Sequence, residues 1–419
     1  MKTTKKLLVT LLVAMLFLTN LAGCTQKEGE QETQGTEEQT GLQLLAGYNS
    51  ASTEDGFYYV ENLGDGFQLI RYVNYETQED TVFCNVQGCT HNNIDCPAGY
   101  HFEVGGVSVF VYNSELYVVC KGGAFTVGAD IGLEEVEEPG FIKKMDLNGE
   151  NEQMLVTLPA GHMMISGIYA SGQDFYFFIR KNEIGEEPYT LIHFDEFGLT
   201  ETDAGAWGFY PGNANGTKIY FMHNFSPYGD EEETPEGYVF TTRWHSYDVE
   251  TGEITKSEFV FDSNEGDAQC INGYFVYYDS ATHEITKTSV STGETEIVAQ
   301  IEVEENVNMV TFSNIYGDCL ELTLHYTTVD ENGNLIRSRN VEVVINIETG
   351  EVHYPQLINV EGTEDNSDIG TVFVLAETET QYLVANREIY GRVSNTFALI
   401  DKEDFWSNTP NFIIIERVD

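Results

Sequence analysis

A pair of β-strands recurs seven times along this chain, and this repeat constrains the fold more than any other feature. In each unit an aromatic strand comes first, and these strands begin near residues 57, 116, 175, 219, 275, 320 and 382. The steps between them are 59, 59, 44, 56, 45 and 62 residues; the shorter steps match a propeller blade and the longer ones require loop insertions. One such unit cannot bury both of its faces, whereas a ring of units can.

The repeat therefore predicts an all-β fold, a seven-bladed β-propeller. The composition agrees, because 24 Tyr, 25 Phe and 39 Gly favour half-buried strands joined by tight turns. The alternative is a non-repetitive all-β array such as tandem sandwiches. If the ring closes, the last strand, within residues 411–417, should lie against the first strands, near 42–48 or Phe57.

Several units end in an acidic glycine turn. The phrase L/I-x-x-D-x-x-T/N-G-E is clearest at residues 141–150, 244–253, 288–294 and 344–351. These strands resemble the blades of TolB-like and WD40-like bacterial propellers. The resemblance implies a fold and no particular activity, because such propellers serve as enzymes, sensors and scaffolds alike.

The N-terminus has the pattern of an export signal. Three lysines precede an apolar run at residues 7–18, which is too short for a comfortable membrane span. The run closes on Leu21-Ala22-Gly23-Cys24, which resembles the lipobox of bacterial lipoproteins. That resemblance implies that the signal peptide, residues 1–23, is removed and that Cys24 carries lipid chains. The alternative is an ordinary secretory signal followed by a chance cysteine.

A polar segment follows the cysteine. Residues 25–40 read TQKEGEQETQGTEEQT and contain no apolar side chain that could support a core. We therefore expect residues 24–40 to form a lipidated cysteine and a flexible, disordered acidic tether, with the propeller domain at 41–419. The expected location is the extracytoplasmic face of the cell membrane, where the lipid anchor holds the protein.

The chain is strongly acidic, with a formal net charge of −49. Removing residues 1–23 discards three lysines and no acids, which leaves 17 − 69 = −52. Such a charge repels nucleic acid and anionic lipid headgroups, so nucleic acid is excluded as a partner and the membrane is expected to be contacted through the anchor alone. Acidic runs at 134–138 and 230–233 are predicted to be solvated loops, because they lack the ligand spacing of a calcium loop.

One segment concentrates metal-binding chemistry. Cys84, Cys89, His91 and Cys96 form a C-x4-C-x-H-x4-C run, which we place in a loop between the first two units. Three thiolates and one imidazole suit structural zinc, although the gaps are not those of common zinc fingers. Disulfide bonding among these cysteines, or with Cys120, is an equal alternative in an extracytoplasmic protein, and a nucleophilic cysteine is a third. The run also resembles a hallmark of surface lipoproteins from anaerobic Gram-positive bacteria, a resemblance that implies no activity.

Catalytic templates do not appear in the sequence. It contains no G-x-S-x-G elbow, no H-E-x-x-H pair and no phosphate-binding G-x-x-x-x-G-K-[ST] loop. We therefore expect a non-enzymatic binding or scaffolding module for protein, peptide or glycan. The alternative is an extracellular carbohydrate-active hydrolase or lyase, whose acids would meet at the propeller axis. The remaining cysteines, Cys120, Cys270 and Cys319, are expected to be small buried hydrophobes.

Overall fold

The computed structural model describes most of the unit Gly41–Asp419. The described residues are 42–46, 50–102, 105–127, 134–159, 161–181, 189–206, 211–225, 241–262, 266–304, 307–329, 335–357, 369–388 and 393–418. The predicted signal peptide and tether lie outside them. Among the described residues, no helix has the length and apolar character that crossing a membrane would need.

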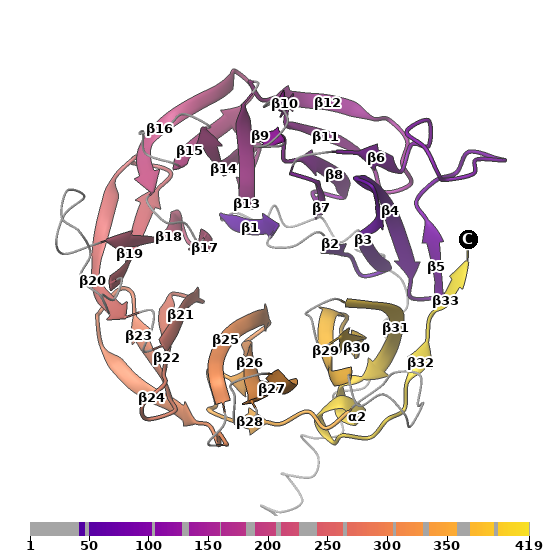
Figure 1. Cartoon of the computed structure of the whole chain (residues 1–419). Coiled ribbons are helices and arrows are strands. Elements are labelled where there is room, and N and C mark those ends of the chain that lie inside the picture. The colour runs from indigo at the N-terminus through magenta and orange to yellow at the C-terminus, as the bar shows by residue number, and fades with distance from the viewer. Residues whose placement is uncertain are drawn as a thin grey trace, which may run out of the picture. The chain divides into compact units, whose positions relative to one another are not determined.

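The domain is a seven-bladed β-propeller (Figure 1). Each blade is an antiparallel sheet whose first strand lies innermost. Blade 1 contains β2 (Ser50–Ser52), β3 (Gly56–Gly64), β4 (Phe67–Asn74), β5 (Glu79–Val82) and β6 (Gly99–His101), and blade 2 contains β7 (Val107–Tyr112), β8 (Glu115–Cys120), β11 (Phe141–Asp146) and β12 (Gln153–Thr157). Blade 3 contains β13 (His162–Ser171), β14 (Asp174–Lys181), β15 (Tyr189–Asp195) and β16 (Gly198–Ala206). Blade 4 contains β17 (Pro211–Asn215), β18 (Lys218–Phe225), β19 (Thr241–Asp248) and β20 (Ile254–Asp262).

The last three blades and the additional elements complete the ring. Blade 5 contains β21 (Gly266–Ile271), β22 (Tyr274–Asp279), β23 (Glu284–Ser289) and β24 (Thr295–Gln300). Blade 6 contains β25 (Val307–Tyr316), β26 (Cys319–Val329), β27 (Leu335–Asn346) and β28 (Val352–His353). Blade 7 contains β29 (Ile369–Glu377), β30 (Gln381–Glu388), β31 (Val393–Asp401) and β32 (Ile413–Ile414). The additional elements are β1 (Gln43–Ala46), the hairpin of β9 (Gly123–Val127) and β10 (Glu134–Glu138), α2 (Lys402–Trp406) and β33 (Glu416–Val418).

The predicted repeat is confirmed strand by strand. The seven aromatic strands are the second strands of the seven blades, and their predicted partners are the third strands. These middle strands are covered on both faces by neighbouring blades, which is why they carry most of the aromatic and β-branched residues. The outer strands were not predicted, because much of their surface is exposed and they carry no comparable apolar pattern; in β24, for example, the first three residues are exposed.

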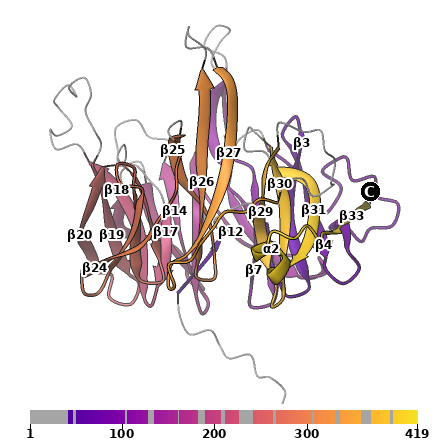
Figure 2. The ribbon, with the colours of Figure 1, turned by 90° about the horizontal axis from the view of Figure 1, so that it is seen from below.

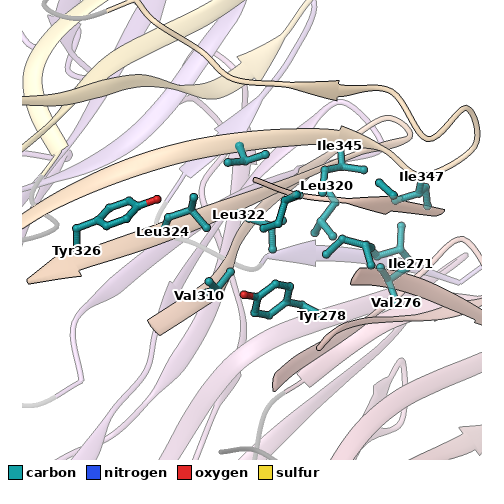
Figure 3. Packing of buried hydrophobic residues seen from close by; sticks show 14 residues of the cluster. Ile271, Val276, Tyr278, Val310, Leu320, Leu322, Leu324, Tyr326, Ile345 and Ile347 are labelled. Atoms are coloured by element: carbon teal, nitrogen blue, oxygen red, sulfur yellow. The ribbon is translucent and has the colours of Figure 1, made fainter. Parts of the chain in front are cut away.

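The core lies between the blades. In blade 6, Leu320, Leu322 and Leu324 alternate along β26, so that all three face the same side. Figure 3 shows Leu320 on the side of Ile271 and Val276 of blade 5 and Leu324 beside Tyr326, in one cluster whose members are almost completely buried. Each blade thus covers the apolar face of the next one, as the repeat requires.

The acidic glycine turns join the third and fourth strands. In blades 4, 5 and 6 the glycine of the turn has a positive φ of 72°, 73° and 74°, a conformation that favours glycine. The glycine N–H donates to the carbonyl oxygen of the residue that ends the third strand, at 2.8 Å in each blade. In blade 4, Asp248 Oδ1 also accepts from the N–H groups of Glu250 and Thr251. The repeated phrase is therefore a turn signal.

The two faces of the ring differ in their connections. Because strands within a blade are antiparallel, first-to-second and third-to-fourth connections lie on one face, which we call the tight-turn face. The second-to-third connections and those between blades lie on the other, the insertion face. The strand pairs β8 and β11, β14 and β15, β18 and β19, and β28 and β29 flank the longest connections, and the ends that they join lie on the insertion face. The strands β26 and β27 also extend beyond the ring on this face, as Figure 2 shows.

The first strand lies where the sequence did not place it. β1 pairs with the inner edge of β13 in blade 3, with Gln43 opposite Ala170. The prediction that residues 42–48 meet the last strand is therefore wrong. Leu42 is buried among side chains of blades 3 and 4, including Tyr169 and Ile219, so this apolar segment gains more cover inside the ring than at its seam. The Leu42 N–H donates to the Gly216 carbonyl oxygen at 3.2 Å, which places the start of the domain on the tight-turn face.

The ring closes between blades 7 and 1. β33 pairs in parallel with β5, and Arg417 lies opposite Asp80. Ile415 packs in one cluster with Phe57 and Phe397, so the second alternative, closure near Phe57, is confirmed. The C-terminal segment thus contacts both blades that meet at the seam.

A buried ionic network holds this seam. Arg71 and Asp80 are each 1% exposed, and Arg71 Nε donates to Asp80 Oδ1 at 3.0 Å. Tyr59 donates its hydroxyl to Asp80 Oδ2 at 2.8 Å, and burial together with this carboxylate raises the pKa of Tyr59 above its ordinary value. Arg417 donates to both carboxylate oxygens of Glu61 at 2.8 Å. Arg71 Nη2 also donates to the Val418 carbonyl oxygen at 3.3 Å, which ties the last strand to blade 1.

We predict that Arg71→Ala destabilises the domain by about 3–5 kcal/mol, because it leaves the buried Asp80 carboxylate without its cation. Chemical denaturation of the mature protein would measure the loss. The control is Lys402→Ala, which removes a surface ion pair with Glu377 and should cost at most about 1 kcal/mol. Equal losses in the two variants would show that the buried network does not stabilise the closed ring.

Candidate metal centre

The cysteine loop, residues 83–98, interrupts the outer strand of blade 1. β5 pairs with residues 71–74 of β4, and β6 pairs with residues 67–69 of the same strand. Ile70 lies between the two pairings and holds both ends of the loop. Phe83 N–H donates to the Ile70 carbonyl oxygen at 3.0 Å, and Ile70 N–H donates to that of Ala98 at 2.9 Å. The loop therefore leaves the blade and returns to it at one residue.

The loop brings the four predicted ligands together. The three cysteine Sγ atoms and a ring nitrogen of His91 all lie within 4.8 Å of one another. His91 Nδ1 is 3.4 Å from Cys96 Sγ. Cys96 is 2% exposed, whereas Cys84, Cys89 and His91 are partly buried. Such a set of soft thiol donors and one imidazole could bind a metal ion.

Local turns produce this arrangement. Gly88 and His91 have positive φ values of 80° and 53°, so the chain reverses on both sides of Cys89. Cys89 N–H donates to the Val86 carbonyl oxygen at 3.1 Å, which closes the first turn. Cys96 N–H donates to the Asn93 carbonyl oxygen at 3.2 Å, which closes the second. The exposed residues of the loop point outward while the four ligands converge.

The thiols differ in their acidity. A hydrogen bond from the His91 backbone N–H is the main cause that lowers the pKa of the Cys89 thiol. Burial raises the pKa of the Cys96 thiol to about 12. A cation placed between the two sulfurs would favour both thiolates, since a nearby positive charge stabilises the ionised form. The pKa values of the two thiols are therefore shifted in opposite directions.

No disulfide joins the six cysteines within the described part of the chain. Cys120 belongs to the same apolar cluster as Cys96 but is not bonded to it. Cys120 and Cys270 are buried, as predicted, and burial raises the pKa of each thiol. Cys319 is only partly buried, so the expectation for this residue holds in part.

Sequence reasoning missed a second group, in blade 3. Atoms of Asp174, His193 and Asp195 lie within 4.8 Å of one another. His193 stacks on Tyr176 with ring centroids 4.6 Å apart, and its Nε2 is 3.5 Å from Asp174 Oδ1. Asp195 Oδ1 already accepts two backbone N–H groups of the following turn. These partly exposed residues form a small polar group, and only the pairing of β14 with β15 brings them together.

Comparisons with known proteins bear on the fold. No protein-family model matches the chain, and no curated protein matches it. An oligogalacturonate lyase from Vibrio parahaemolyticus has a TM-score of 0.47 at 12% identity, covering 88% of this chain and 93% of the other. An uncharacterized protein from Listeria monocytogenes EGD-e has a TM-score of 0.45 at 11% identity, covering 91% and 96%. A puromycin hydrolase has a TM-score of 0.46 at 11% identity, covering 90% of this chain and 54% of the other. This chain therefore spans about half the length of that enzyme. Similarities this low carry no inference about what the chain binds or does.

We predict that the mature protein binds about one zinc ion at the cysteine loop, and that Cys89→Ser removes this binding. Affinity should fall as pH falls from 7.5 to 5.5, because protons compete for the thiolates and the imidazole. Metal analysis after dialysis, with titration against a chromophoric chelator, would measure both effects. Cys319→Ser is the matched control and should keep full binding. Retention of zinc by Cys89→Ser would contradict the assignment of this ligand.

Proposed function

We propose that this protein is a membrane-anchored, extracytoplasmic binding module, in which a lipid on Cys24 holds a propeller that presents its insertion face to a protein, peptide or glycan. The lipobox-like sequence and the polar segment 25–40 support the anchor. The variable lengths of the insertions support binding, because loops on a rigid scaffold commonly carry recognition.

The observation that carries this proposal is the position of Leu42. This residue lies on the tight-turn face, where it bonds to the turn between β17 and β18. A tether that joins the domain there leaves the opposite, insertion face free to meet a partner. A flexible chain of seventeen residues, 25–41, has a typical span of roughly 20–25 Å, which allows the domain to stand off the membrane.

The position of β1 favours binding over the alternative of a carbohydrate-active enzyme. Such an enzyme would gather acids at the propeller axis. Here β1 lies inside the ring on the inner edge of blade 3 (Figure 1). Its neighbour Leu42 is 6% exposed and packs on apolar side chains. A strand of the tethered end thus occupies part of the space in which the acids would meet a substrate.

We also propose that the cysteine loop holds structural zinc. Four protein ligands complete a tetrahedral shell and leave no position for water or substrate, which is typical of structural zinc. The ligands come from one loop of sixteen residues, so the metal would fix local structure. In this role zinc replaces the disulfide that a small extracellular loop otherwise often needs.

Cys24→Ala should move the protein from the membrane fraction into the medium, or leave an uncleaved precursor, because the lipid anchor is lost. Cell fractionation with immunoblotting in the native host or a Gram-positive surrogate would measure the distribution. Cys319→Ala, which changes a cysteine outside the lipobox, should stay in the membrane fraction. Normal processing and membrane retention of Cys24→Ala would contradict the anchor.

Shortening an insertion should weaken ligand binding at least about tenfold, which corresponds to 1.4 kcal/mol. A glycan array and a peptide library would first identify a ligand of the mature protein. Replacing residues 226–240 by a short turn would test the insertion face, and replacing residues 148–151 by Asn-Gly would serve as the tight-turn control. Turnover of a polysaccharide that a single acidic substitution abolishes would instead support the enzyme.

A further inference from the structure

The strand β5 connects the cysteine loop to the seam of the ring. One edge of β5 pairs with β4, and its other edge pairs with β33, where Glu416 lies opposite Glu79 and Val418 opposite Thr81. β5 ends at Val82, only two residues before the ligand Cys84. The Cys84 N–H donates back to the Val82 carbonyl oxygen at 2.7 Å. The strand on which β33 docks and the first metal ligand are thus parts of one short segment.

The metal would hold the free end of β5. This strand has four residues, and beyond it the chain leaves the sheet for the cysteine loop before β6 resumes the pairing with β4. A metal bound to Cys84 and Cys96 would join the end of β5 to the start of β6, because Cys96 is followed closely by Gly99, whose N–H donates to the Cys96 carbonyl oxygen at 2.8 Å. Without the metal, the hydrogen bonds to Ile70 and the apolar packing around Cys96 and Ala98 are left to close a sixteen-residue loop, whose ordering costs conformational entropy.

The strand β33 depends on β5 for its place. Its three residues are all exposed, so apolar burial contributes little to its docking. Its contacts include the ladder with β5, the bond from the Glu416 N–H to the Gln78 carbonyl oxygen, and the bonds from Arg417 to Glu61 and from Arg71 to the Val418 carbonyl oxygen. Asp80, which accepts from Arg71, lies within β5 itself. A displaced β5 would therefore weaken the ladder and the Arg71–Asp80 part of the network together, while Ile415 would keep its packing at the seam.

We infer that metal binding at the cysteine loop favours the closed ring by holding β5 in place for β33. This inference rests on the proposed zinc centre and adds a role for it. The metal would bind more tightly when β33 is docked on β5 than when β33 is released. Since coupling between two sites is reciprocal, docking of β33 must favour metal binding by the same factor.

Hydrogen exchange of the full mature protein tests the inference, in the zinc-loaded form and after chelation. Amides of β5 and β33 should exchange at least about tenfold faster without zinc, because local opening becomes easier. Amides of β22 in blade 5 are the internal control and should be unchanged. Cys84→Ser in the presence of zinc should reproduce the chelated pattern, whereas Cys319→Ser should not.

The reciprocal experiment removes residues 416–419 and measures zinc affinity by chelator competition. The truncated chain should bind zinc about tenfold more weakly if the coupling has that size. Stoichiometric zinc binding with unchanged exchange of β33 would overturn the inference and leave the zinc centre intact. Failure of the full chain to bind zinc would overturn the zinc centre and the inference with it. Wild-type zinc affinity of the truncated chain would also count against coupling.

Discussion

Closure of the ring is the constraint on which the rest of this structure depends. Every blade is covered by its neighbours, so an open ring would expose the apolar faces on both sides of the seam. The seam combines an apolar cluster around Phe57 and Phe397 with the buried pair of Arg71 and Asp80. The apolar cluster supplies cohesion, whereas the ionic network penalises wrong registers, because any other pairing would leave a buried charge without its partner.

The closing strand is a small element with a large structural role. β33 has three residues and joins blade 1 in parallel, although every other strand pair of the described sheets is antiparallel. Its own residues bury little apolar surface. The ladder with β5, together with the buried neighbour Ile415 and the Arg417–Glu61 pair, holds β33 in place, and β5 in turn borders the cysteine loop. The candidate metal centre and the closure thus belong to one region of blade 1. In our inference the loop therefore also stabilises the strand on which β33 docks.

The two faces of the propeller differ in the length of their connections. The tight-turn face carries short connections, whose glycines adopt the positive φ that a close reversal requires. It is also the face that the N-terminal segment joins, through Leu42. The strands that flank the long connections end on the insertion face, where connections can differ without disturbing the sheets. The proposed attachment by one face and recognition by the other builds on this difference between the faces.

The sequence by itself determined the middle of every blade and the content of the cysteine loop. Middle strands are buried on both faces, so their aromatic residues repeat visibly. The four candidate ligands lie within thirteen residues, Cys84 to Cys96, so their clustering is visible in the sequence, whereas the structure shows that their ligand atoms converge. Only the tertiary structure decided where β1 lies, because its short apolar pattern fits the inner edge of any blade. It also decided the meeting of Asp174 with His193 and the parallel pairing of β33, since strand register depends on contacts between distant residues. Local sequence patterns indicate which residues are buried and where the chain turns, whereas the closure of the whole ring decides which strand edges pair with each other.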